Sequence, residues 1–236
     1  MTGVLRLACI DSQAPPLFNL SEDGVSRTGY EPDVAALVAH ELGLTLQWVF
    51  TPWDNMIPAV QSGAADAVWC GQGMTEERMR QVDFTQPYAV FNETVLVRAG
   101  DPARAPEDMA GYRVGAIANS TNMALAMTIP GIIPVEFGAS DDVFGDMIEA
   151  LRSGEVDAFI DDDVVTIALG AEPDFDVAFT AMTGNRWGVG LSKANSSLRN
   201  DIDSALDTLI ADGRLRAVWQ KWMPDLTFPL ESRAND

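Results

Sequence analysis

Strand-like and helix-like segments alternate along this chain. Apolar runs at Val4 to Ile10 and Leu44 to Phe50 have the length of strands, and apolar residues at helical spacing lie between them in residues 33–42. Further strand-like runs occupy residues 113–118 and 132–137. Strands that alternate with helices indicate parallel βαβ units, so we expect an α/β fold.

One part of the pattern is repeated. The segment WDNMIPAVQSGAADAVW, Trp53 to Trp69, aligns without gaps on FGDMIEALRSGEVDAFI, Phe144 to Ile160. Each copy predicts a short amphipathic helix, a Ser-Gly end that suits positive φ, and a following strand. The repeat favours two lobes of similar architecture, although helix-Gly-strand units also resemble one another by chance.

The connections between the copies predict how the lobes divide the chain. Pro87 to Arg98 reads as a strand without a Gly/Ser-rich linker, and Arg186 to Leu191 is a second candidate crossing. Residues 198–222 read as a terminal helical region whose natural docking site is the first lobe. We therefore predict lobe 1 at residues 1–92 plus 188–236, lobe 2 at 93–187, and a two-strand hinge near 90–95 and 185–190.

Two polar segments follow the repeated strands. Cys70-Gly71-Gln72-Gly73 follows the first and Asp161-Asp162-Asp163 ends the second. Ligands of open α/β sheets bind beyond the carboxyl ends of the strands. We expect the two segments to face each other across a ligand cleft between hinged lobes.

Charge narrows the range of partners. The 236 residues carry 35 acidic and 15 basic side chains, a net charge of −20, which repels phosphate backbones and anionic lipids. Nucleic acid is therefore not an expected partner. The acidity suits a solubilising surface better than a specific cationic partner. No apolar run has the length of a membrane helix and no export signal is visible, which fits a cytoplasmic protein or a chain without its leader.

Cysteine and histidine are scarce. The two cysteines, Cys9 and Cys70, form no CxxC or His/Cys cluster, so zinc is disfavoured. Buried free thiols are favoured over a disulfide, which stays open. The single histidine, His40, lies off the apolar stripe of its helix and is expected at the surface.

Four stretches of the chain are specific enough to compare with known families: GYEPDVAALVAHELG, WDNMIPAVQSGAADAVWCGQGMTEERMRQVDFTQPY, GYRVGAIANST and ALDTLIADGRLRAVWQKWM. Together they resemble the polar-amino-acid branch (family 3) of the periplasmic solute-binding proteins that serve ABC transporters. The resemblance implies the type II two-lobe α/β fold, each lobe a β-sheet flanked by helices. It also implies a monomeric periplasmic protein, without cofactor or enzymatic activity, that captures an amino acid by lobe closure for a membrane permease.

The resemblance assigns the ends of the ligand to residues of this chain. Arg78 matches the arginine that binds the α-carboxylate, although a surface arginine paired with Glu76 or Glu77 is the alternative. On the facing lobe, Asn119-Ser120-Thr121 would offer helix N–H groups to the same anion, unless Ser120 or Thr121 only caps its helix. Asn119 stands where the family commonly has glycine, and asparagine tolerates left-handed backbone.

The ammonium of the ligand is assigned to Asp162, with Cys70 beside it and the carbonyl oxygens of Gly71 and Gly73 completing the site. Adjacent strand residues alternate faces, so one acid of the Asp161 to Asp163 run should aim elsewhere. The three acids could instead bind calcium, but they lack regular ligand spacing.

The pocket for the ligand's side chain matches the family least. Ala14 stands where an aromatic residue commonly stacks on the ligand. Trp53 and Met56, and also Trp69 and Phe18, are candidates to replace it, with core packing as the alternative. Asp11 matches the position that relatives use for cationic side chains, which weakly favours Lys, Arg, ornithine or His.

Two rival functions stay open. Cyclohexadienyl (prephenate or arogenate) dehydratases resemble these binding proteins, but we find no acid paired with an apolar setting that raises its pKa. A ligand-sensing domain of a receptor would have the same lobes. GxGxxG and P-loop patterns do not occur, so nucleotide chemistry is not expected.

Overall fold

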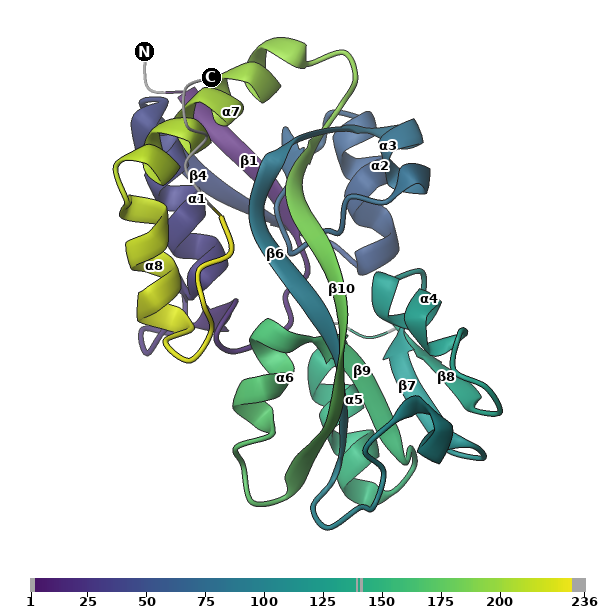
Figure 1. Cartoon of the computed structure of the whole chain (residues 1–236). Coiled ribbons are helices and arrows are strands. Elements are labelled where there is room, and N and C mark those ends of the chain that lie inside the picture. Colours follow the sequence, from purple (N-terminus) through teal and green to yellow (C-terminus); the bar gives the residue numbers. More distant parts are fainter. Residues whose placement is uncertain (1–2, 139, 141, 231–236) are drawn as a thin grey trace, which may run out of the picture. The chain divides into compact units, whose positions relative to one another are not determined.

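A computed structural model describes residues 3–138, 140 and 142–230 of the chain. The chain forms two compact units. Unit 1 comprises Met1–Asp11, Pro16–Val90 and Asn185–Asp236, and unit 2 comprises Ser12–Pro15 and Phe91–Gly184. Each unit is an α/β structure, and the strands of both units belong to one hydrogen-bonded order, β4-β1-β5-β10-β6-β9-β7-β8 (Figure 1).

The first half of this strand order, β4-β1-β5-β10, contains the strands of unit 1 and the long strand β10, whose last residues lie in that unit. The central strand β1 (Gly3–Cys9) runs parallel to β4 (Leu44–Phe50) on one side and to β5 (Ala67–Val68) on the other. The long strand β10 (Phe175–Leu191) pairs antiparallel with β5. The predicted strands at 4–10 and 44–50 are therefore confirmed, within one residue.

Helices at both ends of the sequence meet in unit 1. The first helix, α1 (Tyr30–Glu41), packs against α7 (Ser196–Ala211) and α8 (Arg214–Trp222), which appear in green and yellow in Figure 1. The predicted terminal helical region is thus confirmed, as two helices docked on unit 1. The smaller elements are β2 (Asn19–Leu20), β3 (Arg27–Thr28), the 3-10 helix η1 (Trp53–Asn55), α2 (Met56–Gln61) and α3 (Glu76–Gln81). His40 is exposed, as expected.

The second half of the strand order, β6-β9-β7-β8, repeats this plan with the strands of unit 2 and the long strand β6, whose last residues lie in that unit. Its central strand β7 (Arg113–Ile117) runs parallel to β8 (Ile133–Phe137) and β9 (Ala158–Asp162). The long strand β6 (Asp83–Arg98) pairs antiparallel with β9. The helices are η2 (Pro106–Met109), α4 (Thr121–Ala126), α5 (Val143–Ser153) and α6 (Asp163–Leu169).

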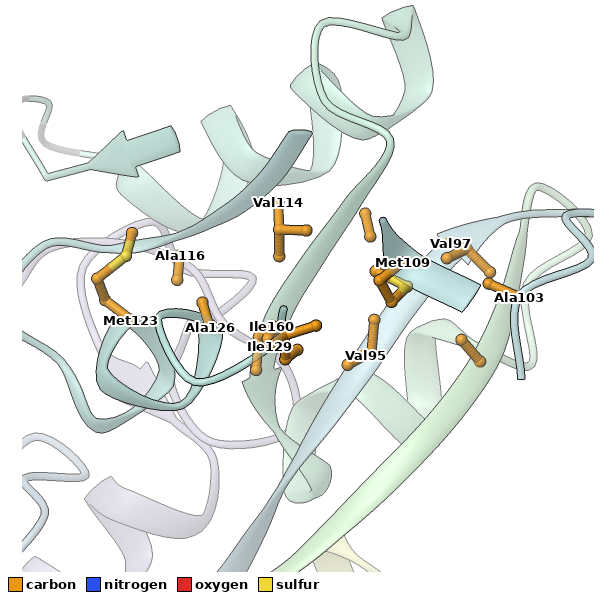
Figure 2. Packing of buried hydrophobic residues seen from close by; sticks show 12 residues of the cluster. Val95, Val97, Ala103, Met109, Val114, Ala116, Met123, Ala126, Ile129 and Ile160 are labelled. Atoms are coloured by element: carbon orange, nitrogen blue, oxygen red, sulfur yellow. The ribbon is translucent and has the colours of Figure 1, made fainter. Parts of the chain in front are cut away.

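The core of unit 2 joins its sheet to α4 and the neighbouring turns. Val95, Val114 and Ile160 project from β6, β7 and β9 and pack with Met123 and Ala126 of α4 (Figure 2). Removal of this apolar surface from water is the main stabilising contribution. The core fixes the end of β9, where the three aspartates lie.

The sequence repeat corresponds to a repeated structure. Helices α2 and α5 each end before a glycine of positive φ, Gly63 at 78° and Gly154 at 80°. In each unit the strand that follows is preceded by an aspartate that binds an arginine of the central strand. Asp66 accepts hydrogen bonds from the backbone and guanidinium of Arg6, and Asp157 accepts the same set from Arg113.

The boundaries between the units fall inside strands. One lies between Val90 and Phe91 in β6, and the other lies between Gly184 and Asn185 in β10. The chain therefore passes between the units as strand at both boundaries, and the first boundary has no Gly/Ser-rich linker.

Candidate functional site

Arg78 is held in unit 1 by the start of α3. The Thr75 hydroxyl caps this helix by accepting a hydrogen bond of 3.2 Å from the Arg78 backbone N–H. The Arg78 side chain is only 8% exposed, and its Nη1 donates to the Gly73 carbonyl oxygen at 3.0 Å. The alternative of a surface arginine does not fit this burial, and Glu76 pairs with Arg80 instead.

Aromatic and glycine residues surround the guanidinium. The Arg78 Cζ atom lies 5.4 Å from the ring centre of the half-buried Trp53, within the range of cation–π attraction. The Gly73 carbonyl also accepts from the Thr75 N–H, at 3.0 Å. The Gly73 carbonyl therefore accepts two hydrogen bonds within unit 1 and helps to position Arg78. Its binding of the ammonium stays a prediction.

Cys70 and Gly71 follow β5 beside a buried polar group. Gly71 has φ of 55°, and its N–H donates to the Tyr88 hydroxyl at 3.3 Å. That hydroxyl in turn donates to Glu31, at 3.0 Å to each carboxylate oxygen. The Cys70 Sγ lies 3.0 Å from the Cys9 Sγ, and both cysteines are free thiols. The hydrogen bonds from Gly71 to Tyr88 and from Tyr88 to Glu31 hold the backbone of this segment.

In unit 2, Asn119-Ser120-Thr121 forms the turn that precedes α4. Asn119 has φ of 58° and is the only non-glycine residue of positive φ in the described ranges. Asparagine therefore supports the left-handed turn, as predicted. The Ser120 hydroxyl accepts from the Met123 N–H at 3.0 Å and donates to the Ile117 carbonyl at 2.6 Å. Ser120 thus caps α4, and Thr121 is the first residue of that helix.

The three aspartates at the end of β9 are all buried. Asp161, Asp162 and Asp163 are 7%, 8% and 7% exposed. Asp161 accepts from the Asp162 backbone N–H at 2.7 Å, and Asp163 accepts from the Asn92 side chain at 2.9 Å. One oxygen of Asp162 and one of Asp163 are buried without a hydrogen-bond partner in the part of the chain that the structure describes. None of the three aspartates is turned out to solvent.

Burial without a cation changes the acidity of this cluster. No ion pair joins Asp161, Asp162 or Asp163 to a lysine or arginine within the described residues. Desolvation raises the pKa of Asp161 to about 7, and it also raises the pKa of Asp162 and of Asp163. A bound cation would offset the cost of ionising these groups.

Two further residues belong to the cluster and were not predicted. Glu93 of β6 lies opposite Asp162 in the antiparallel pairing with β9, and its charge contributes to the raised pKa of Asp162. It accepts a hydrogen bond from Thr183. Asn122 of α4 donates to Asp161 at 3.4 Å, and its side chain partly offsets the rise in the pKa of Asp162. The sequence holds no signal for this grouping, because strand register joins residues far apart in the chain.

The other candidates for the side-chain pocket lie in core or surface positions of unit 1. Met56 is 0% exposed and packs in a core cluster with residues such as Ile57 and Val60, a core position rather than a pocket wall. Trp69 and Phe18 are also buried. Asp11 forms an ion pair with Arg27, whose guanidinium lies 4.7 Å from the Phe50 ring centre. Asp11 therefore already has a cation as partner.

Neither a metal centre nor a membrane span is found in the described ranges. No three His, Cys, Asp or Glu side chains there are arranged to hold a metal ion. No helix in those ranges combines the length and the apolar character needed to cross a membrane.

One group of proteins recurs in the comparisons of this chain with known proteins. A family model described as bacterial extracellular solute-binding proteins, family 3, matches residues 6–225. The L-cystine-binding protein TcyJ of Escherichia coli (strain K12) is 27% identical over 222 residues, which cover 92% of this chain and 81% of that protein.

Solved structures agree with the fold. An ancestral arginine-binding protein bound to arginine matches with a TM-score of 0.85 and 30% identity, covering 94% of this chain and 99% of that one. The ancestral amino acid-binding protein AncCDT-1, a precursor of cyclohexadienyl dehydratase, matches with a TM-score of 0.81 and 27% identity, covering 93% and 94%. The expected α/β fold class of two-lobe amino-acid-binding proteins is thereby confirmed.

Proposed function

Because the chain belongs to the family 3 bacterial extracellular solute-binding proteins, we propose that it binds an α-amino acid or related zwitterion for an ABC transporter. Its relatives include proteins named for the binding of cystine, glutamine, arginine and histidine. The proposed site of action is the periplasm, and the proposed partner is a membrane permease.

Arg78 is our proposed ligand for the α-carboxylate. Its guanidinium is buried, lies against the Trp53 ring and is oriented by the Gly73 carbonyl. A buried guanidinium forms strong, bidentate hydrogen bonds with a carboxylate because both groups are planar and charged. Thr121 at the start of α4 is proposed to contribute a backbone N–H to the same carboxylate.

Asp162 is our proposed ligand for the α-ammonium, and the observation that carries the proposal is its burial without a cation. Asp161 and Asp163 adjoin it in the chain and Glu93 lies opposite it in the strand pairing, so this end of the site holds more carboxyl groups than one ammonium can pair with. The pKa values of the three aspartates are raised, and a second positive group on the ligand would favour their ionised forms. We therefore favour an amino acid with a cationic side chain, such as arginine, lysine or ornithine.

Calorimetric titration of site variants tests this assignment. Arg78→Ala and Asp162→Ala should each weaken binding by about 2–5 kcal/mol, because each leaves the opposite charge of a desolvated pair unmatched. Arginine, lysine and ornithine should bind more tightly than glutamine or cystine to the unmodified protein.

Arg80→Ala is the matched control, since Arg80 lies two residues from Arg78 in the same helix but pairs with Glu76 at the surface. It should keep the original affinity. Unchanged binding by the Arg78 or Asp162 variant would remove that residue from the site, and tighter binding of neutral amino acids would overturn the cationic preference.

Prephenate provides the test against an enzymatic role. The likeness to AncCDT-1 is to an amino-acid-binding precursor of a dehydratase, and Asp161 is a buried acid whose pKa is raised to about 7. We propose binding without turnover, so no phenylpyruvate should form when prephenate is supplied. Its formation, measured by absorbance, would contradict the binding-only function.

A further inference from the structure

The two cysteines of the chain meet at neighbouring strand ends in unit 1. Cys9 is the last residue of β1 and Cys70 follows β5 by two residues, with 3.0 Å between the Sγ atoms. Ala8 lies opposite Val68 in the parallel pairing of these strands. Cys70 is therefore displaced by one residue from the position opposite Cys9.

This offset suits a disulfide. Adjacent strands with a displacement of one residue give a Cα separation of about 6 Å, which is close to the commonest value for disulfide-bonded cysteines. Rotation about the side-chain bonds can bring the sulfur atoms from their thiol contact into bonding distance.

We propose that Cys9 and Cys70 form an intramolecular disulfide that joins β1 to the segment before Arg78. The chain has only these two cysteines, so one pairing exists. The family is extracellular, and disulfides form and persist in the oxidising compartments outside the cytoplasm.

The bond forms by exchange with a small disulfide such as oxidised glutathione. Cys70 is partly exposed, so its thiolate attacks one glutathione sulfur and releases the other glutathione as a thiol. The Cys9 sulfur then loses its proton, attacks the Cys70 sulfur and expels the second glutathione thiolate, which takes up a proton. Two protein thiols are oxidised, and one glutathione disulfide is reduced to two thiols.

The second step should limit the rate. Cys9 is buried, and desolvation together with the neighbouring Cys70 raises its pKa well above the usual range. The thiolate that must attack is therefore scarce, although it lies in contact with its target. Once formed, the bond closes a loop of about sixty residues, which restricts the unfolded chain and stabilises the folded one.

Peptide mapping tests the bond directly. The whole protein, without added amino acid, is incubated with oxidised glutathione, denatured in acid, alkylated and digested with trypsin. Cleavage after Arg6, Arg27 and Arg78 places Cys9 in peptide 7–27 and Cys70 in peptide 28–78. We expect the two peptides to be joined after oxidation and to separate after reduction.

Thermal melting tests the stabilising effect. The oxidised protein should melt roughly 5–10 °C above the reduced protein. The control is the double variant Cys9→Ser/Cys70→Ser, whose melting temperature should not respond to the oxidant. Alkylation of both cysteines after oxidation, separate glutathione adducts, or a bond without a higher melting temperature would overturn the proposal. Each outcome is independent of the amino-acid ligand.

Discussion

Glu31 is a buried acid of unit 1 whose place at the start of α1 gives the protein a pH-dependent stability. Its side chain is 2% exposed and accepts hydrogen bonds from the Tyr88 hydroxyl. Desolvation raises its pKa from 4.5 to about 8, because the hydrogen bonds from Tyr88 and the Gly71 backbone only partly offset the loss of water. The folded state therefore binds a proton that the unfolded chain releases.

The sign of the effect follows from this difference. Below pH 4.5 both states hold the proton, and between 4.5 and about 8 only the folded state does, so the free energy of unfolding falls as pH rises through this window. We expect Glu31 to account for up to about 5 kcal/mol of this fall. Glu31→Gln should show a smaller fall, measured by urea denaturation near pH 5 and near pH 8.

Asp161 and its neighbours in unit 2 also make the free energy of unfolding fall as pH rises. They do so in both the original protein and Glu31→Gln, so the difference between these two proteins isolates the effect of Glu31. Tyr88→Phe is a useful companion variant, because it removes the hydroxyl donor and keeps the carboxyl group. The Tyr88→Phe variant should show a larger fall in the free energy of unfolding between pH 5 and pH 8 than the original protein. If the free energy of unfolding falls equally with pH in the original protein and in Glu31→Gln, the proton that the folded state binds is not on Glu31.

At the scale of elements, the repeated helix-glycine-strand segments are fixed by two ion pairs. Asp157 binds the Arg113 guanidinium in unit 2, at 2.8 Å to Nη2, and Arg98 lies 3.4 Å from the same aspartate. Of the described residues, only Arg6 forms an ion pair with Asp66 in unit 1. Asp157 thus has one arginine partner more than Asp66, and the hydrogen bonds from Arg113 lower the pKa of Asp157 to about 2.

Asp157→Asn should therefore destabilise the protein more than Asp66→Asn at neutral pH, by about 1–2 kcal/mol for the partly exposed Asp157. The contribution of a carboxylate with a lowered pKa is complete above 3.8 and disappears as pH falls towards 2. Denaturant unfolding near pH 7 and near pH 3 measures both effects.

Asp174→Asn is the control, since Asp174 forms a surface ion pair with Arg152 at 3.3 Å. Its effect should be small at both pH values. An Asp157→Asn variant as stable as the original protein would remove the ion pair as a support of β9.

At the scale of the molecule, the two units share one strand plan. A central strand, β1 or β7, lies between two parallel neighbours, and a long strand that passes between the units pairs antiparallel with one of them. We propose that one ligand binds Arg78 of unit 1 and Asp162 of unit 2, and thereby favours closed conformations over open ones.

Small-angle X-ray scattering measures this response. A saturating cationic amino acid should decrease the radius of gyration of the original protein, because closed conformations gain the binding energy of both units. Asp162→Ala at the same ligand concentration should keep the value of the ligand-free protein. An unchanged radius of gyration in the original protein, with binding verified by calorimetry, would contradict closure.

Much of the fold could be predicted from the sequence because its signals are local. Hydrophobic periodicity located β1, β4, β7 and β8, and the Ser-Gly ends located the turns after α2 and α5. The left-handed turn at Asn119 was expected because the family resemblance places glycine there and asparagine tolerates the same backbone conformation. The family motifs indicated Arg78 and Asp162 as candidate ligands, and their roles stay predictions.

The tertiary structure decided which polar groups lost their water and which partners they gained. It placed Met56 in the core, gave Asp11 a cation in Arg27, and used the Gly73 carbonyl to hold Arg78. It also brought Glu93 and Asn122 to the aspartates, and Glu31 to Tyr88. Desolvation and hydrogen bonding depend on residues that are distant in the chain, so the acidity of these groups cannot be predicted from sequence patterns alone.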